Sequence, residues 1–224
     1  MNDKWKPKRM AQDRIIAIDS FLSKSICRSV LKELTLCVWQ PSGVVGKWSN
    51  QSKRRESLYS DSRSSCTVYE DGFSSALRER LAHIESDIAN IINTEVAKFE
   101  GWQATNYQQG EQFDFHLDAG VDFSKQFAGD RVRSIILYLE SPDEGGETHF
   151  RALNIRIRPE MGKLVIWKNL LPSGFPDFAM IHAGMPVLKG SKTILVTWER
   201  KRIHRMEQSE RTEKWTKTRS ISKP

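Results

Sequence analysis

The sequence predicts a mainly β domain with flanking helices, an α+β fold built around a barrel or a sandwich. Short β-rich runs separated by turns follow one another closely from residue 103 onward, a pattern typical of those two architectures. Two upstream segments carry apolar residues at helical spacing. At 224 residues the chain has the length of one domain with an ample core, or of one domain plus small additions.

The first half of the chain is predicted to form a strand, a helix, a loop and a second helix. Ile15–Ile18 is a short apolar run typical of a strand. Ser20 fits the N-cap of a helix whose apolar positions continue to Leu34. Residues 41–62 are polar and rich in Gly, Ser, Lys and Arg, which predicts a mobile loop. The second helix is expected from about 74 to 92, with one apolar face.

The second half is predicted to consist of short strands joined by turns. The β-rich runs cover residues 103–109, 113–118, 132–139, 147–150, 153–158, 163–167, 178–183 and 192–199.

The net charge of +7 is concentrated at the two ends of the chain. Residues 1–10 hold four Lys or Arg against one Asp, and residues 199–224 hold nine Lys or Arg against four Glu. We therefore divide the chain into a basic extension at 1–10, a nearly neutral domain at 11–200 and a basic tail at 201–224. Such a tail binds nucleic acid or an acidic partner in some proteins, but a solvated extension is the favoured interpretation.

Cysteine content and apolar patterning indicate the cellular compartment of the protein. Cys27, Cys37 and Cys66 are an odd number without C-x-x-C spacing, so we expect free thiols. No apolar run reaches about 18 residues, so no transmembrane helix is expected. The N-terminus lacks the apolar stretch of a secretory signal. These features together predict a cytoplasmic protein without membrane association.

Two histidines and one aspartate have the residue types of a metal site. In a strand, residues two apart face the same way, which places His116 beside Asp118 and puts Phe113 and Phe115 on the opposite face. His182 follows 64 positions after Asp118, so a fold must bring distant strands together. Two histidines and a carboxylate form the facial triad that holds non-haem Fe(II). A single H-x-D is common by chance, so the prediction depends on the whole set.

A lysine ten positions beyond the second histidine completes the set. Lys192 opens an apolar β-rich run and is either a strand-edge lysine that reaches solvent or a buried cation with an anionic partner. Gly145–Thr148 offers a tight turn followed by a strand hydroxyl, or an ordinary solvated turn.

From Trp102 to Arg200 the sequence resembles the prolyl 4-hydroxylase branch of the Fe(II)/2-oxoglutarate-dependent dioxygenases. Six stretches agree with that family in order and spacing: Tyr107–Gly110, Phe113–Asp118, Arg133–Leu139, Gly145–Phe150, Gly162–Leu170 and His182–Lys192. The resemblance implies a double-stranded β-helix, the jelly-roll or cupin-like barrel, with its core at about 102–200 and with N-terminal helices that buttress it.

The resemblance also implies the cofactors and the residues that hold them. His116, Asp118 and His182 are expected to bind Fe(II) and to carry catalysis. Lys192 is expected to pair with the distal carboxylate of the 2-oxoglutarate co-substrate. Further co-substrate contacts are expected from Tyr107, Thr148 and Trp198. O2 is the oxidant, and ascorbate is an additional expected cofactor.

Substrate contacts are implied less specifically. Arg63 and Ser65 resemble an arginine-serine strand that faces the substrate, and Arg133 or Arg131 resembles a second substrate-facing arginine. In the family, the region equivalent to 41–62 closes over substrate, so Trp48 and Lys53–Arg55 are candidate lid residues. The family often has an aromatic hydroxyl where this chain has Phe113 and a tryptophan where it has Thr193.

Four functions remain open at the level of sequence. The first is hydroxylation of a peptide or protein, at proline, with release of succinate and CO2. The second is the same chemistry on a free amino acid or other small metabolite, which Phe113 favours. The third is demethylation of nucleic acid, ranked lower because Lys192 stands where those enzymes use an arginine pair. The fourth is a non-catalytic binding module, which the complete set of ligands disfavours. The oligomeric state is not predicted.

Overall fold

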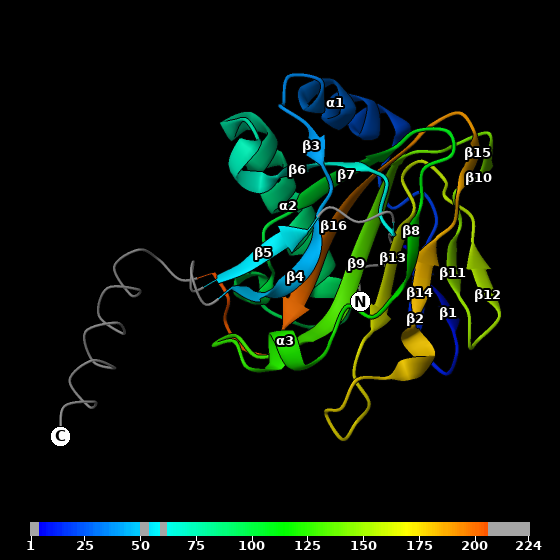
Figure 1. Cartoon of the computed structure of the whole chain (residues 1–224). Helices are drawn as coiled ribbons and strands as arrows, with labels where there is room; N and C mark the ends of the chain where they lie inside the picture. The colour runs from blue at the N-terminus through cyan, green and yellow to red at the C-terminus, as the bar shows by residue number, and fades with distance from the viewer. Residues whose placement is uncertain (1–4, 50–53, 59–61, 206–224) are drawn as a thin grey trace.

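The structure is a computed structural model, and it describes residues 5–49, 54–58 and 62–205. Two sheets and two long helices make up the fold (Figure 1). Every strand pairing within the described residues is antiparallel. The main sheet has eight strands, in the order β1 (Lys8–Met10), β2 (Ile15–Ile18), β13 (Leu164–Lys168), β9 (Arg131–Glu140), β16 (Lys192–Arg200), β7 (Gln103–Tyr107), β6 (Cys66–Tyr69) and β3 (Gln40–Pro41).

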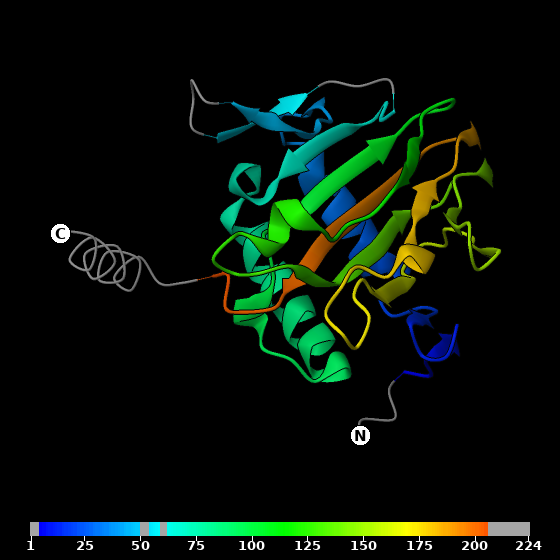
Figure 2. The same cartoon turned by 60° about the horizontal axis from the view of Figure 1, so that its bottom comes forward.

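The second sheet is smaller and faces the main sheet (Figure 1). It has four strands, in the order β12 (Ile155–Ile157), β11 (Thr148–Phe150), β14 (His182–Gly184) and β8 (Phe113–His116). Two short pairs complete the strands: β10 (Glu144–Gly145) with β15 (Val187–Lys189), and β4 (Val44–Ser49) with β5 (Arg54–Leu58). Figure 2 shows the β4–β5 hairpin beyond the β3–β6 edge of the main sheet.

The helices cover the face of the main sheet that points away from the small sheet (Figure 1). These covering helices are α1 (Lys24–Leu34) and α2 (Ser75–Ile92). Elsewhere the chain forms a short α3 (Val121–Ser124) and three 3-10 turns, η1 (Glu70–Gly72), η2 (Val96–Lys98) and η3 (Phe178–Met180). Ser74 caps α2 by accepting a hydrogen bond from the Leu77 amide, which confirms the predicted start of this helix. Among the described residues, no helix combines the length and the apolar character that crossing a bilayer requires.

Strand β9 is buried on both faces and separates two apolar cores. Ile135 and Leu137 pack with the helices, whereas Ile136 and Tyr138 face the small sheet. This alternation follows from the two-residue period of a strand. The helices therefore hold one face of the main sheet rigid while the other face lines the interior between the sheets.

Three predicted elements are wrong in detail. The 41–62 segment contains the β4–β5 hairpin where a loop was expected, since strand pairing uses backbone groups and does not require apolar composition. Ser20 is not an N-cap: its φ is +51°, and Ser23 caps α1 instead. Residues 178–183 begin as η3, which Asp177 caps, and the strand starts only at His182.

Short segments on both sides of the predicted 11–200 domain contact it in the structure. Residues 8–10 form β1, which pairs with β2, so part of the basic extension belongs to the main sheet. After β16, Arg205 binds the buried Glu85 through both guanidinium NH groups, at 2.7 Å each. The folded domain thus continues at least to residue 205. The remainder of the predicted tail lies outside the described residues, as does the candidate lid residue Lys53.

Candidate active site

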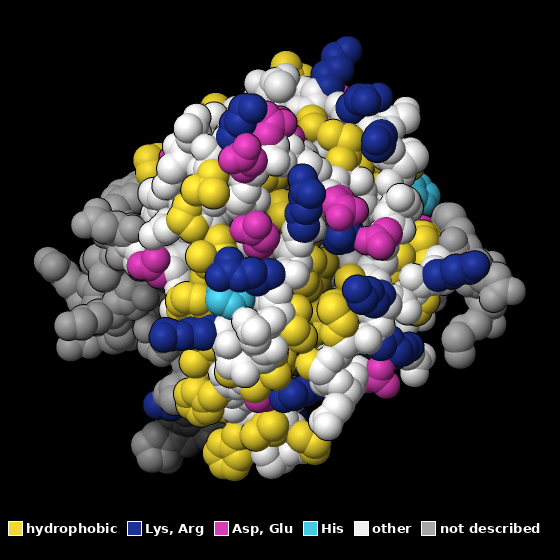
Figure 3. All heavy atoms as spheres, turned by 90° about the vertical axis from the view of Figure 1, so that its right-hand side faces the viewer, with side chains coloured by type: hydrophobic (Ala, Val, Ile, Leu, Met, Phe, Trp, Pro, Cys, Tyr) yellow, Lys and Arg dark blue, Asp and Glu magenta, His cyan; other side chains and the backbone are white. Residues whose placement is uncertain are grey.

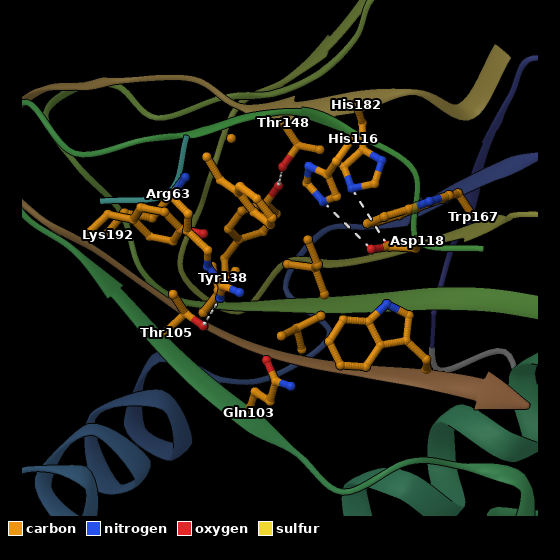
Figure 4. Close-up of a pocket in the computed structure, with 17 residues that line it drawn as sticks. Arg63, Gln103, Thr105, His116, Asp118, Tyr138, Thr148, Trp167, His182 and Lys192 are labelled. Carbon is orange, nitrogen blue, oxygen red and sulfur yellow. Dashed lines mark hydrogen bonds and ion pairs between the residues drawn. The ribbon is translucent and has the colours of Figure 1, made fainter. Parts of the chain in front are cut away.

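A pocket opens between the two sheets and collects most of the candidate side chains. Strands β7, β8, β9, β14 and β16 all contribute to its wall. In Figure 4, His116, Asp118 and His182 lie at one end, and Lys192 and Arg63 lie at the other. We refer to these as the metal end and the lysine end.

The metal end brings together residues that are 64 positions apart in the chain. His116 ends β8 and His182 begins β14, and the two are direct partners across this strand pair. Asp118 follows β8, with its Oδ1 3.6 Å from His116 Nε2 and its Oδ2 3.6 Å from His182 Nε2. The three potential ligand atoms lie within 4.8 Å of one another.

Hydrogen bonds orient both imidazole rings towards this point. His116 Nδ1 lies 2.7 Å from the Asp114 carbonyl, and His182 Nδ1 lies 3.0 Å from the Met180 carbonyl. A carbonyl only accepts hydrogen bonds, so Nδ1 carries the proton in each ring and Nε2 is left with a lone pair. Both lone pairs are therefore available to a metal on the side of Asp118.

Electrostatics favour the same protonation states. Burial, followed by the neighbouring His182, lowers the pKa of His116 to about 3, so this imidazole is neutral near pH 7. Burial opposes ionisation of Asp118, but the neighbouring histidines and Arg131, together with the Ser134 hydroxyl, outweigh it and hold the pKa of this carboxyl at about 2. A carboxylate beside two imidazoles that turn Nε2 towards it is the donor set of non-haem Fe(II), with coordination positions left for other ligands. The residues present fit Fe(II).

The facing predicted for Phe113 is wrong. Gly184 pairs with Phe113 and His182 pairs with His116, so β8 uses one residue more than β14 between these pairs. This β-bulge turns Phe113 to the same side as His116, against the simple alternation of a strand. The Phe113 ring stacks on His116 at a centroid distance of 3.8 Å and lines the pocket.

The lysine end presents a buried cation. Lys192 is 2% exposed, donates to the Gly146 carbonyl at 3.0 Å, and lies 4.2 Å from the centre of the Tyr107 ring. Burial lowers its pKa to about 8. Gly146 adopts a φ of +73°, and a Cβ there would lie 3.0 Å from Pro142 and 3.4 Å from the Lys192 side chain, so a glycine suits this turn. Within the described residues, no carboxylate forms an ion pair with Lys192.

Comparisons with known proteins agree with this arrangement. The family model of the 2OG-Fe(II) oxygenase superfamily matches residues 102–200. The α-1 subunit of prolyl 4-hydroxylase from Gallus gallus is 31% identical over 53% of this chain, and the match spans 24% of that subunit. Probable prolyl 4-hydroxylase 10 from Arabidopsis thaliana is 26% identical over 89% of this chain and 73% of its own length.

Residues 102–200 therefore match a 2OG-Fe(II) oxygenase domain, and the chain resembles the prolyl 4-hydroxylases. Its fold resembles that of the viral collagen prolyl hydroxylase from Paramecium bursaria Chlorella virus-1, solved as a 2-oxoglutarate complex. That likeness has a TM-score of 0.63 at 23% identity, over 84% of this chain and 97% of the other. The expected double-stranded β-helix is thereby confirmed.

The expected co-substrate residues of this oxygenase lie along the pocket. Tyr107, Thr148 and Trp198 all line it, and Tyr107 lies beside Lys192. Trp198 pairs across the sheet with Ser134, whose hydroxyl contacts Asp118, so Trp198 belongs to the metal end. Contact of these three residues with 2-oxoglutarate stays a prediction.

Sequence reasoning missed several residues of this wall, among them Tyr138. Its hydroxyl lies 2.6 Å from Thr148 Oγ1, and burial raises its pKa far above the usual value, so it remains a neutral hydrogen-bonding group. The signal was present in the sequence, because Tyr138 interrupts the aliphatic run from Ile135 to Leu139, in which Ile136 shares its face.

The candidate substrate residues differ in their placement. Arg63 lines the pocket, lies 4.6 Å from the centre of the Phe113 ring and donates to Thr105 Oγ1 at 3.3 Å. Ser65 is buried beneath it and donates to Ser42. Arg133 does not line the pocket and instead pairs with Glu199. Arg131, the alternative to Arg133, lies over the Trp198 ring at 3.6 Å and binds Glu100.

Proposed function

We propose that this oxygenase hydroxylates a prolyl residue in a peptide or protein. The observation that carries the proposal is a pocket in which the triad of His116, Asp118 and His182 faces Lys192. The curated relatives named above are prolyl 4-hydroxylases, which supports a peptidyl substrate.

The residues of the pocket have separate tasks in this reaction. The triad holds Fe(II), which, with 2-oxoglutarate and O2, supplies the oxidation of a substrate C–H bond and leaves succinate and CO2. Lys192 binds the distal carboxylate of 2-oxoglutarate, since a buried cation is stabilised by an anionic partner. Tyr138 and Thr148 offer hydroxyl groups in the same pocket. Arg63 offers its guanidinium to a substrate carbonyl or carboxylate at the same pocket.

A free amino acid or other small metabolite is the second candidate substrate. Phe113 favours it, because an apolar ring stacked on His116 stands where the family often has a hydroxyl. A substrate that needs that hydroxyl as a hydrogen-bond partner is therefore disfavoured.

Peptide and metabolite substrates are distinguished by coupled turnover. Iron-loaded protein is given 2-oxoglutarate and O2 with a proline-rich peptide, with free proline, or with neither, and succinate and oxidised product are both measured. The proposal predicts peptide-stimulated succinate formation together with one oxygen atom added at proline. Succinate formation stimulated by free proline and not by the peptide would contradict a peptidyl substrate and favour a small metabolite.

Ascorbate, a cytoplasmic location and a nucleic-acid substrate are three further proposals. The role of ascorbate as a reductant is checked by whether it prolongs turnover. A cytoplasmic location is checked by fractionation of the source cells. Nucleic acid stays a lower-ranked substrate: on the face shown in Figure 3, the described basic and acidic side chains are interspersed with apolar ones, whereas a nucleic-acid site favours a continuous basic patch.

A further inference from the structure

A buried hydrogen-bond chain lies behind the metal end. Ser134 Oγ donates to Asp118 Oδ2 at 2.5 Å, and Asn169 Nδ2 donates to Ser134 Oγ at 2.8 Å. Asp118 is 7% exposed, Ser134 0% and Asn169 1%. The bond to the carboxylate is charge-assisted, which makes it shorter and stronger than a bond between neutral groups.

The direction of this chain is fixed by the chemistry of its members. An ionised carboxylate only accepts hydrogen bonds, so the Ser134 hydroxyl must donate its one proton to Asp118. Ser134 Oγ can then only accept from Asn169, and an amide donates through nitrogen. The assignment of Asn169 Nδ2 towards Ser134 therefore follows from the ionised state of Asp118.

The backbone holds both members rigidly. Ser134 lies within β9, between Trp167 on β13 and Trp198 on β16. The Asn169 amide N–H donates to the Val132 carbonyl at 2.9 Å, and the Asn169 carbonyl accepts from the Asp177 amide at 2.8 Å. Asp177 caps η3, which leads into His182. The hydrogen-bond chain thus links β9, which carries Ser134, to the η3 segment that leads into His182.

Within the described residues, the Asn169 side chain makes one hydrogen bond. Among the described residues, its Nδ2 bonds to Ser134, and its Oδ1 is buried without a hydrogen-bond partner. The Asn169 amide therefore acts in this hydrogen-bond chain only as a donor to Ser134.

We propose that Ser134 and Asn169 are positioning residues that fix the orientation of the Asp118 carboxylate as a metal ligand. Asp118 Oδ1 lies 3.6 Å from His116 Nε2 and Oδ2 lies 3.6 Å from His182 Nε2, so both oxygens stand at the metal end. The Ser134 hydroxyl occupies one lone pair of Oδ2 and holds the carboxylate in this orientation. Hydrogen bonds behind metal ligands commonly change metal affinity by about 10- to 100-fold when removed. The inference rests on the metal site and not on the identity of the substrate.

The test measures metal binding directly. Co(II), whose visible absorption reports coordination number, is titrated without oxygen into the full chain and into Ser134→Ala, Asn169→Leu and Ser134→Thr. Thr197→Val is the matched control, because the Thr197 hydroxyl is 0% exposed on the same sheet but bonds to the Glu100 carbonyl. We expect Ser134→Ala to bind Co(II) about 10- to 100-fold more weakly with an altered spectrum. Asn169→Leu should show a smaller shift in the same direction, and Ser134→Thr should restore both readouts.

Two results would overturn the proposal. One is unchanged affinity and spectrum in both Ser134→Ala and Asn169→Leu. The other is an equal loss in Thr197→Val, which would make the effect a general result of disturbing the sheet. If Ser134→Ala does not fold, Asn169→Leu carries the test, with Ser134→Thr as its reference. Peptide hydroxylation is not measured, so a wrong substrate leaves the result unaffected.

Discussion

The two ends of the pocket differ in how many protein groups surround the buried charge. At the metal end, the Asp118 carboxylate already has the Ser134 hydroxyl and two imidazoles around it. At the lysine end, the buried Lys192 donates to the Gly146 carbonyl and lies over the Tyr107 ring, and among the described residues no carboxylate forms an ion pair with it. The metal end is therefore preorganised by the protein itself, whereas the lysine end is completed by an anionic ligand. A molecule with a chelating group and a distal carboxylate, such as 2-oxoglutarate, satisfies both ends.

The largest expected effect comes from removing the charge of the metal end. Asp118→Ala leaves two neutral imidazoles, which hold Fe(II) far less well than the triad, so succinate formation should fall to background. Asp114→Ala is the matched control, because Asp114 lies on β8 with its side chain exposed. Turnover retained in Asp118→Ala, with lost turnover in the control, would contradict the assignment of the metal end.

Removing the cation of the lysine end should act on co-substrate affinity. Truncating one partner of a buried charge pair costs about 2–5 kcal/mol, so Lys192→Met should raise the Kd for 2-oxoglutarate by roughly 30-fold to several thousand-fold. Binding is measured without oxygen on metal-loaded protein. Metal affinity should be unchanged, as it should be in the control Lys189→Met, an exposed lysine on β15. A loss of metal affinity in Lys192→Met would contradict the separation of the two ends.

A pH titration distinguishes the ends without mutation. Burial lowers the pKa of Lys192 to about 8 in the free protein, and 2-oxoglutarate binds the charged form. Its affinity should therefore be constant below pH 8 and fall by up to about tenfold per pH unit above it. In the free protein the same shift makes stability rise with pH above 8, because the unfolded chain still holds this proton. Lys192→Met should abolish the pH dependence, and a flat profile in the unmodified protein would contradict the role of Lys192.

The smallest effect on activity is expected at Arg133. Its guanidinium pairs with the buried Glu199, outside the pocket lining. Arg133→Gln should lower the free energy of unfolding by about 1–3 kcal/mol, because it leaves a buried carboxylate short of a partner, while kcat/KM for substrate changes little. Arg63→Gln provides the contrast, with kcat/KM lowered and stability retained. The reverse pattern would support the substrate role predicted for Arg133.

The sequence predicted what strong physical constraints determine. The triad and Lys192 were recognisable because metal ligation and a buried charge admit few residue types, and the helix at 75–92 was recognisable from its cap and apolar face. Phe113 was misplaced because a bulge shifts the register by one residue and leaves no mark in composition. The β4–β5 hairpin was missed because its pairing lies in the backbone. Tyr138, Ser134 and Asn169 were missed because their contacts exist only once distant strands meet.

The most direct test of the account is oxygen-dependent conversion of 2-oxoglutarate to succinate by the full iron-loaded chain, measured beside Asp118→Ala and Lys192→Met over a range of co-substrate concentrations. We predict turnover in the unmodified protein, none in Asp118→Ala, and turnover in Lys192→Met only at raised 2-oxoglutarate concentration. No succinate from folded protein with confirmed Fe(II) binding would contradict a pocket whose two ends hold one co-substrate for catalysis.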